Sequence, residues 1–444
     1  MRASSAARAT IVLLVSALFS CSTPAAPPPS GNPALHPSLD DALANGFAPL
    51  VGRAPFATEL WLEDAVGWDI RWETAGAEPT GGGMRIALRF ARPGVYQPSA
   101  TLSTRGRETV TLTRRIVVIA DAPPPLPSGK FGVNQDLPAD PPPQVASEIR
   151  LMRAAGVGWL RLPLRWFWNE PRRGQVRWDY FDGVVQQAGD AGLELLAVLG
   201  GTPRWASGVD NTTAPRTVER DAFPPTRTSD FTAYVYRMVD RYRGRVRAYE
   251  MLNEPNSPDH WAPAPNAERF VELLCAGYLA AKYADPDATV VVGGLNGNGL
   301  ALGYEAPVSR DFLKAIYAGA GSRCFDVMAI HPFAHPTEDG IATLQSWVDA
   351  TRAYMSSMSD TRPLWLTEVG WSSGQNLWGH TTITEDEQAK WVREVYGVGG
   401  VQKLFWYNFK ETRADPNDPE LQWGWLRYDL QPKPAYRAFA ALPK

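Results

Sequence analysis

The chain has 444 residues, of which 44% are hydrophobic and 20% are charged, and it carries a formal net charge of −3. This length exceeds one ordinary domain and suits a large domain with a smaller module, and the apolar content is enough for a sizeable core. The small negative charge argues against a strongly basic surface of the kind that binds nucleic acid or acidic membranes. We therefore expect no nucleic-acid partner. We also expect a monomer.

The N-terminus has the pattern of an export signal. Arg2 and Arg8 supply positive charge around the start of an apolar stretch, residues 11–19. This stretch is far shorter than the ~18 apolar residues that a membrane-spanning helix needs, so it indicates a cleaved signal peptide. We expect residues 1–20 to be removed on export.

The residues that follow indicate a lipid anchor. Leu18-Phe19-Ser20-Cys21 resembles a bacterial lipobox, in which Cys21 would be lipidated and become the first residue of the mature protein. The Pro/Ala/Ser-rich segment after it predicts a flexible tether over residues 21–45. We expect a protein that is anchored to the bacterial cell envelope, with ordinary cleavage and secretion as the alternative.

Residues 46–122 predict a small all-β module. Short β-prone runs are separated by glycine and proline, with an evident turn at residues 80–83. The segment 90–96 and the two runs after it resemble the second half of bacterial Ig-like β-sandwiches. Residues 123–130 are proline-rich and predict a stiff linker, because repeated proline favours extended geometry.

From Phe131 onward the pattern alternates between strand and helix, which predicts an α/β fold, a (β/α)8 TIM barrel over residues 131–444. The expected strands are residues 131–134, 159–163, 193–199, 247–252, 289–294, 327–331, 364–367 and 403–408. Helical runs include residues 145–155, 180–191, 267–283 and 384–396. A doubly wound sheet is the alternative, but no Gly-rich phosphate loop opens a helix after the first strand.

Two glutamates stand at the ends of expected strands. Glu254 follows strand four within Asn253-Glu254-Pro255-Asn256, and Glu368 follows Thr367 at the end of strand seven. The C-terminal ends of barrel strands form one rim, where catalytic residues gather, so we expect the two carboxylates to face each other. Such a pair can cleave a glycosidic bond, with one carboxyl as proton donor and the other as nucleophile. A lone glutamate there would more often form a rim salt bridge.

These motifs resemble the large clan of barrel-shaped retaining glycoside hydrolases, and most of all family 39 and the related bacterial exopolysaccharide glycosidases. The similarity extends over residues 131–443. It includes Arg161-Leu-Pro163, Thr202-Pro-Arg-Trp-Ala-Ser207, His331-Pro332, Phe405-Trp-Tyr407, Gly424-Trp-Leu and Pro432-Lys-Pro-Ala-Tyr436. The combination is specific for the clan but not for a substrate.

The resemblance implies a role for each matching residue, without a cofactor. Glu254 would be the general acid/base and Glu368 the nucleophile. Asn253 would bind the sugar 2-hydroxyl, and Arg161 would lie beside the nucleophile and keep it ionised. His331 would lie near the acid/base. For Arg161 and His331 taken singly, a structural ion pair and a core imidazole are equally good interpretations.

Aromatic residues are candidates for sugar contacts. Trp406 would form the platform under the cleaved sugar, and further subsites could come from Trp168, Trp205, Trp261, Trp371 and Tyr407. Packing is the plainer interpretation for most of the 17 tryptophans. Many clan members have tyrosine two residues after the strand-six histidine, where its hydroxyl bonds the nucleophile. This chain has Phe333 there, and Tyr407 is one residue that could replace the missing hydroxyl.

The two remaining cysteines, Cys275 and Cys324, predict a disulfide in an exported protein, and two separate buried thiols are the alternative. Metal binding has little support, because the 5 histidines are scattered along the chain. We expect hydrolysis of a β-linked poly- or oligosaccharide. A non-catalytic polysaccharide-binding barrel and a transglycosylase are the alternatives, and the β module would be a spacer or a weak sugar-binding module.

Overall fold

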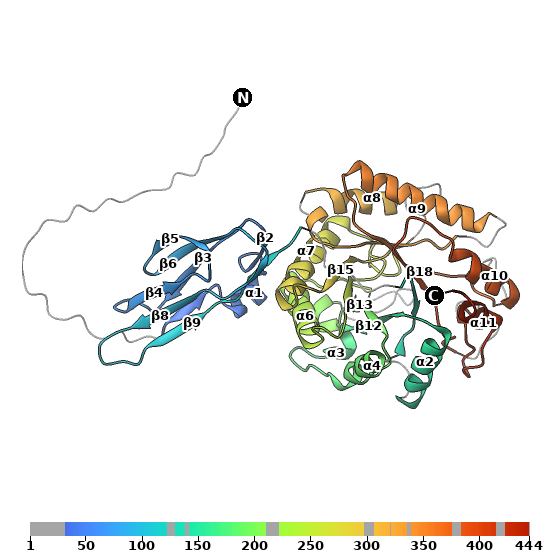
Figure 1. Ribbon diagram of the computed structural model, residues 1–444, viewed down its shortest axis with the longest axis horizontal. Coiled ribbons are helices and arrows are strands. Elements are labelled where there is room, and N and C mark those ends of the chain that lie inside the picture. The colour runs from blue at the N-terminus through green and yellow to red at the C-terminus, as the bar shows by residue number, and fades with distance from the viewer. Residues whose placement is uncertain are drawn as a thin grey trace, which may run out of the picture.

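The computed structural model describes residues 32–121, 129–137, 142–209, 222–296, 306–319, 321–334, 339–374, 383–413 and 422–443. The predicted signal peptide, Cys21 and nearly all of the proline-rich linker lie outside these residues. Within the described part of the chain, no helix is both long and apolar enough to cross a membrane. An N-terminal all-β module stands beside a barrel, as Figure 1 shows.

Three small sheets build the N-terminal module. They comprise β1 (Ala34–His36), β3 (Phe56–Glu63), β6 (Arg85–Phe90) and β5 (Glu78–Gly82); β4 (Asp69–Glu73), β8 (Ser99–Ser103) and β9 (Val110–Thr113); and β2 (Val51–Arg53), β10 (Ile116–Ile119) and β7 (Gly94–Tyr96). Period-two burial explains β6, where Ile86, Leu88 and Phe90 are buried and the alternate residues are exposed. The predicted all-β module is confirmed.

The predicted tether is wrong in its second half. Strand β1 pairs antiparallel with β3, and helix α1 (Leu39–Asn45) follows with a capping box at Ser38. Leu35 and Ala42 are 3% and 1% exposed, so this segment buries apolar side chains in the module. The Pro/Ala/Ser-rich composition runs on to Ser38, but the chain is already paired there, and the module therefore begins by Ala34.

The larger part is the predicted (β/α)8 barrel. Its parallel strands run in the order β15 (Thr289–Val292), β14 (Ala248–Met251), β13 (Glu194–Gly200), β12 (Trp159–Arg165), β11 (Phe131–Asn134), β19 (Lys403–Trp406), β18 (Leu364–Val369), β17 (Met328–His331) and β16 (Leu295–Asn296). A parallel bridge between Val291 of β15 and Val327, the residue before β17, closes the sheet into a barrel. All eight expected strands are present, and the fifth is interrupted at Gly293 and Gly294 to give β15 and β16.

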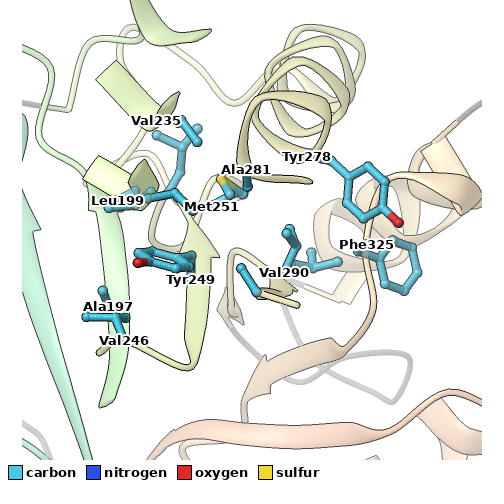
Figure 2. Packing of buried hydrophobic residues seen from close by; sticks show 14 of the residues in the cluster. Ala197, Leu199, Val235, Val246, Tyr249, Met251, Tyr278, Ala281, Val290 and Phe325 are labelled. Atoms are coloured by element: carbon cyan, nitrogen blue, oxygen red, sulfur yellow. The ribbon is translucent and has the colours of Figure 1, made fainter. Parts of the chain in front are cut away.

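Helices surround the barrel (Figure 1). They are α2 (Pro142–Ala155), α3 (Trp166–Asn169), α4 (Asp179–Asp190), α5 (Arg204–Ser207), α6 (Thr228–Arg241), α7 (Ala267–Ala284), α8 (Ala306–Tyr317), η2 (Gly321–Arg323), α9 (Gly340–Ser357), α10 (Glu385–Val395) and α11 (Pro434–Ala440). Strand side chains alternate between this outer layer and the barrel interior. In Figure 2, Met251 of β14 points toward Val235 of α6 and Ala281 of α7.

The inward-facing positions at the lower end of the strands form an apolar floor. It consists of Trp159, Leu196, Ala248, Val291, Val327, Ala329, Trp365 and Phe405. Trp159 and Trp365 meet edge to face with ring centroids 5.7 Å apart. Gly132 completes this layer, since a Cβ there would lie 2.4 Å from the Phe405 ring. The floor closes the barrel interior below the C-terminal rim.

The β module is docked on the barrel through α6 and α7. Phe47 is 1% exposed, and its ring lies 5.6 Å from Tyr236 of α6 and 4.8 Å from Tyr283 of α7. Arg53 of β2 donates to the Tyr278 hydroxyl at 2.9 Å and to the Arg323 carbonyl at 3.2 Å. One continuous apolar core therefore joins the two parts.

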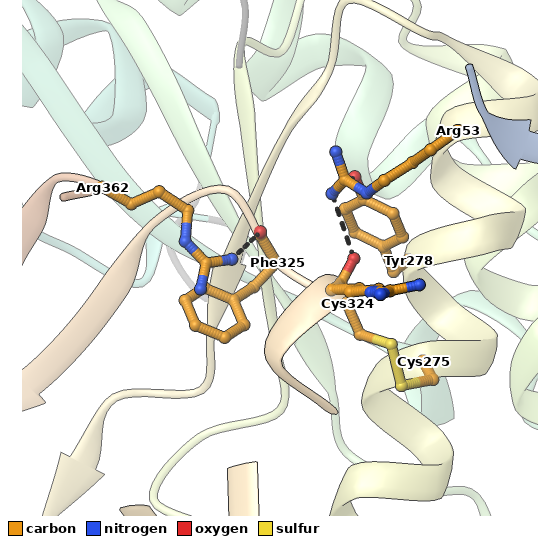
Figure 3. Close-up of a disulfide and its surroundings, with 7 residues drawn as sticks. Arg53, Cys275, Tyr278, Cys324, Phe325 and Arg362 are labelled. Carbon is orange, nitrogen blue, oxygen red and sulfur yellow. Dashed lines mark hydrogen bonds between the residues drawn. A yellow bond between two sulfur atoms is a disulfide. The ribbon is translucent and has the colours of Figure 1, made fainter. Parts of the chain in front are cut away.

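A disulfide lies next to this contact (Figure 3). Cys275 of α7 and Cys324, which follows η2, are joined by a sulfur–sulfur bond across a separation of 49 residues. The predicted disulfide is confirmed, and the interpretation as two separate thiols is wrong. The bond ties α7 to the segment that leads into β17, beside the carbonyl that Arg53 contacts.

Candidate active site

A layer of polar side chains lies directly above the apolar floor. Each inward-facing floor residue is followed two positions later by another inward residue, because strand side chains have a period of two. Several of these are polar: Asn134, Arg161, Glu250, His331, Thr367 and Tyr407. A parallel barrel brings them to one end, and a cleft of about 310 Å³ opens above them.

Arg161 is the centre of this layer and is 5% exposed. Its Nε and Nη2 donate to the two carboxylate oxygens of Glu250 at 2.8 and 3.1 Å. Nη1 donates to Oε1 of Glu368 at 2.5 Å and to Asn134 at 2.7 Å, and Nη2 reaches Asn253 at 2.7 Å. Burial lowers the pKa of Arg161, but the two carboxylates outweigh it and the pKa is raised. The guanidinium thus stays charged and fixes Glu368.

Glu254 lies in a backbone turn that ends β14. Leu252 and Glu254 have φ values of +68° and +41°, a left-handed conformation that is costly for residues with side chains. Such outliers cluster at functional sites, where the surroundings hold them in place. The Glu254 side chain accepts from Asn296 at 2.5 Å, and its Oε1 lies 2.7 Å from Nδ1 of His331.

A bulge near the end of β18 presents Thr367 and Glu368 to the site. The register with β19 shifts between Leu366 and Val369, which leaves one extra residue in β18. As a result Thr367 meets Glu250 at 3.2 Å and His331 at 2.9 Å, while Glu368 meets Arg161. Two consecutive residues thereby reach the same site.

The two glutamate carboxylates lie close together. Glu254, His331 and Glu368 each offer one atom, and these atoms all lie within 4.8 Å of one another. Nδ1 of His331 is 2.7 Å from Glu254 and 3.8 Å from Oε2 of Glu368. This is the only group in the described residues that could hold a metal ion, but its members already bond one another and Arg161. The same arrangement suits proton transfer and nucleophilic attack.

The surroundings of Glu254 and His331 shift both pKa values. Burial raises the pKa of Glu254, but the His331 hydrogen bond and the charges of His331 and His260, with the Asn296 bond, lower it overall. Burial lowers the pKa of His331, but the carboxylates of Glu368 and Glu254 raise it overall. Both shifts favour the histidine as the holder of a proton shared across the short Nδ1–Oε1 contact.

The structure brings most of the predicted residues together. Arg161, Asn253, Trp261, Glu368 and Tyr407 line the cleft. Glu254 and His331 lie against Glu368, and each is at most 5% exposed.

The predicted platform Trp406 is wrong, because its ring faces away from the cleft. It is 1% exposed and packs 5.7 Å from Trp371 and 5.9 Å from Trp425, under the helices. Strand alternation places Phe405 and Tyr407 inward and Trp406 outward. Tyr407, directly after the end of β19, is the aromatic residue that reaches the cleft.

Three other predicted tryptophans do not line the described part of the cleft. Trp371 is 2% exposed and donates to the Ala334 carbonyl at 2.8 Å. Trp205 donates to the Glu170 carbonyl at 2.8 Å. Trp168 is half-buried and lies under Arg165, whose guanidinium carbon is 4.7 Å from its ring centroid. Arg165 lines the cleft, so Trp168 is one contact removed from it.

Some site residues were absent from the sequence prediction. Glu250 is fully buried within strand four. The only sequence signal for it is a charged residue two positions after an apolar residue that faces the barrel interior. Asn296 ends β16 and has no motif around it. His260 is different, because the sequence Asp259-His260-Trp261 after the acid/base motif already suggested a place near the site, and its Nε2 is 3.4 Å from Glu254. The ring of Phe333 packs edge-on against that of Tyr407, with ring centroids 6.2 Å apart. That the Tyr407 hydroxyl takes the place of the tyrosine hydroxyl that Phe333 lacks stays a prediction.

Comparison with known proteins supports the barrel fold described above. No family model matches the chain. Endo-1,4-beta-xylanase 3 of Hypocrea jecorina is 26% identical over 139 residues, which cover 30% of this chain and 37% of that protein. The match therefore spans little more than a third of the length of these curated relatives.

Solved structures are similar over far more of the chain. A family 39 glycoside hydrolase from Bacteroides cellulosilyticus WH2 gives a TM-score of 0.54 at 22% identity, covering 88% of this chain and 80% of that one. A GH5_18 protein from Streptomyces cattleya, in complex with GlcNAc, gives 0.53 at 19% identity, covering 72% and 80%. A GH10 endoxylanase from a sugarcane soil metagenome gives 0.52 at 11% identity, covering 71% and 97%. The predicted resemblance to barrel-shaped glycoside hydrolases is confirmed for the fold.

Proposed function

We propose that this protein is a retaining glycoside hydrolase that cleaves β-linked poly- or oligosaccharides, with Glu254 as acid/base and Glu368 as nucleophile. The carboxylate separation carries this proposal, since one oxygen of each lies within 4.8 Å of the other. Retaining enzymes hold their two carboxyls about 5–5.5 Å apart, whereas inverting enzymes need about 6.5–9.5 Å to admit a water molecule. The short separation supports direct attack by Glu368.

The contacts of the site suggest how each step proceeds. Arg161 occupies Oε1 of Glu368, so Oε2 is the oxygen that attacks the anomeric carbon while the glycosidic carbon–oxygen bond breaks. Glu254 gives its proton to the leaving oxygen. In the second step the Glu254 carboxylate takes a proton from water, whose oxygen attacks the glycosyl-enzyme and frees Glu368.

The charge on Glu368 links these steps to the shared proton. That charge raises the pKa of His331 and so helps the ring to hold the proton. The charge disappears as Glu368 forms its bond to the sugar, and the proton is then released through Glu254 to the leaving group. Afterwards the carboxylate of Glu254 is ready to act as a base.

The substrate class rests on the relatives and on the cleft. The curated relative is named as a β-1,4-xylanase, which supports a β-linked polysaccharide. Amide side chains at Gln135, Asn253 and Asn408 line the cleft beside Tyr407 and Trp261, a mixture that suits sugar hydroxyls and ring faces. Both arginines that line the cleft, Arg161 and Arg165, are paired with carboxylates, which favours a neutral sugar.

A panel of polysaccharides and aryl glycosides tests the proposal. Glu254→Ala and Glu368→Ala should each lower turnover by several orders of magnitude, while Glu272→Ala, an exposed α7 variant, should not. Azide should rescue the two inactive variants and give products of opposite anomeric configuration. Near-normal activity in either variant would overturn the assignment. A competing sugar acceptor separates hydrolysis from transglycosylation, and wild-type protein that binds a polysaccharide without turnover would be a binding protein.

We also propose that the protein is exported and anchored through a lipid on Cys21. The disulfide between Cys275 and Cys324 supports export, because such bonds persist in oxidising compartments. Labelled palmitate should appear in the wild-type protein and not in Cys21→Ser, which should also leave the membrane fraction. Membrane retention of that variant would contradict the lipid anchor.

A further inference from the structure

Glu250 joins the two halves of the site. It is fully buried at the centre of β14, between Arg161 on one side and Thr367 on the other. From Glu254 to Glu368 the chain of contacts runs through His331, Thr367, Glu250 and Arg161 without a break. Neither Thr367 nor Glu250 needs to touch a sugar, and the proposed reaction assigns them no step.

The partners of Glu250 fix the hydrogen-bonding role of its oxygens. Its oxygens meet Nε and Nη2 of Arg161 and the backbone N–H of Gly294, the last at 2.8 Å. All of these groups can only donate, so both Glu250 oxygens act as hydrogen-bond acceptors. The close approach of Gly294 requires glycine, because a Cβ there would lie 2.0 Å from Nε2 of His331.

The direction of the next two hydrogen bonds follows. The Thr367 hydroxyl, 3.2 Å from Oε1 of Glu250, must donate its single hydrogen to that carboxylate. The Thr367 oxygen is then free to accept at 2.9 Å from Nε2 of His331, which must carry a hydrogen. Direct contact between His331 and Glu250 spans 3.8 Å, too long for a hydrogen bond.

We propose that Thr367 and Glu250 are positioning residues that keep a hydrogen on Nε2 of His331, so that Nδ1 is left to share one proton with Glu254. This rests on the proposed function, because it assigns Glu254 the role of proton donor. A neutral His331 with its hydrogen on Nδ1 would hold Glu254 ionised at 2.7 Å, and no proton would be available for the leaving group. With the hydrogen on Nε2, the same contact delivers a proton.

Thr367→Val tests this device, because valine keeps the shape and removes the hydroxyl. Nε2 loses its acceptor, the ring hydrogen moves to Nδ1, and proton donation by Glu254 fails. General acid catalysis contributes about 10²–10⁴-fold, so kcat/KM should fall by about that factor for glycosides with poor leaving groups. A dinitrophenyl glycoside of the same sugar leaves without a proton and should be cleaved at nearly the wild-type rate. Thr367→Ser keeps a hydroxyl and should restore the activity.

The matched control is Thr351→Val in α9. Thr351 is also fully buried and donates to the Trp347 carbonyl at 2.9 Å, so its loss reproduces the cost of removing a buried hydroxyl away from the cleft. It should leave both substrates unaffected. An equal loss with both leaving groups in Thr367→Val, or no loss with either, would overturn the proposal.

Glu250→Gln tests the carboxylate itself. It should slow both substrates, because it also weakens the hold of Arg161 on Glu368. The control is Glu148→Gln, which alters another fully buried carboxylate, paired with Lys410 at 2.8 Å. Wild-type rates in Glu250→Gln would remove Glu250 from the proposal.

Nitrogen NMR of the histidine rings tests the hydrogen position without activity or a Thr367 variant. The groups that face the His331 ring are Glu250, Glu254, Glu368 and, at longer range, Arg161. When alkaline solution has removed the shared proton, His331 should keep its remaining hydrogen on Nε2. A hydrogen found on Nδ1 instead would overturn the proposal. Because this readout does not require turnover, it fails or succeeds independently of the proposed hydrolysis.

Discussion

Asn296 donates its side-chain amide to Oε2 of Glu254 at 2.5 Å. The backbone of Asn296 is held in position by the side chain of Asn256. That side chain donates to the backbone carbonyl of Asn296 at 2.7 Å and accepts from its backbone N–H at 2.9 Å. The bond stabilises the ionised form of Glu254 and contributes to its lowered pKa.

Asn296→Ala should therefore raise the pKa of Glu254. The acid form would persist to higher pH, and the basic limb of the kcat/KM profile should move upward in pH. Asn266→Ala removes an equivalent amide at the α7 N-cap, away from the cleft, and should leave the limb unchanged. Movement of the limb to lower pH would show that Asn296 does not act through the carboxylate.

Tyr407 and Trp406 are neighbours with opposite environments, and their variants should separate activity from stability. Tyr407→Ala should lower kcat/KM about tenfold or more, since losing ~1.4 kcal/mol of sugar contact gives that factor. Trp406→Phe should cost about 1–3 kcal/mol of unfolding free energy with little change in kcat/KM. Chemical denaturation and kinetics on the same samples check both. A selective activity loss in Trp406→Phe would restore it as the platform.

The disulfide should stabilise the fold without contributing to the chemistry. Cys275→Ala/Cys324→Ala should lower the free energy of unfolding by about 2–4 kcal/mol, because the unfolded chain is no longer cross-linked across 49 residues. Reductant should destabilise the wild type by a similar amount and leave the double variant unaffected. A reductant effect that persisted in the double variant would have another origin.

Phe47 should couple the unfolding of the β module to that of the barrel. Phe47→Ala removes a buried ring from between Tyr236 and Tyr283 and should cost about 3–5 kcal/mol. We expect the two parts to unfold in separate denaturant steps. Phe90→Ala, which removes an equally buried ring within the module, should weaken it without separating the steps. A single transition in Phe47→Ala would show that other contacts provide the coupling.

The order of the elements could be predicted from the sequence because each barrel strand is a short apolar run between helical patterns. Glu254 and Glu368 were found because their motifs end such runs. Which face a side chain takes could not be predicted at the strand ends, and Trp406 was misplaced by one position for that reason. A bulge in β18 and a break between β15 and β16 set the local register there.

Other parts of the site depend on contacts between distant segments. Glu250 and Thr367 lie 117 residues apart, and only the closed barrel reveals that they bond. The tether was predicted from composition alone, yet the pairing of β1 with β3 requires partners elsewhere in the chain. Tertiary contacts of this kind have no local sequence signal.

The docking of Phe47 on α6 and α7 limits how this active site can be moved or shortened. A chain that began near the barrel's first strand would leave the rings of Tyr236 and Tyr283 facing water, together with the Tyr278 hydroxyl that Arg53 now contacts. Such an apolar surface favours self-association, so the isolated barrel should express poorly and precipitate. Anyone who transplants the cleft into another protein must carry the small module with it.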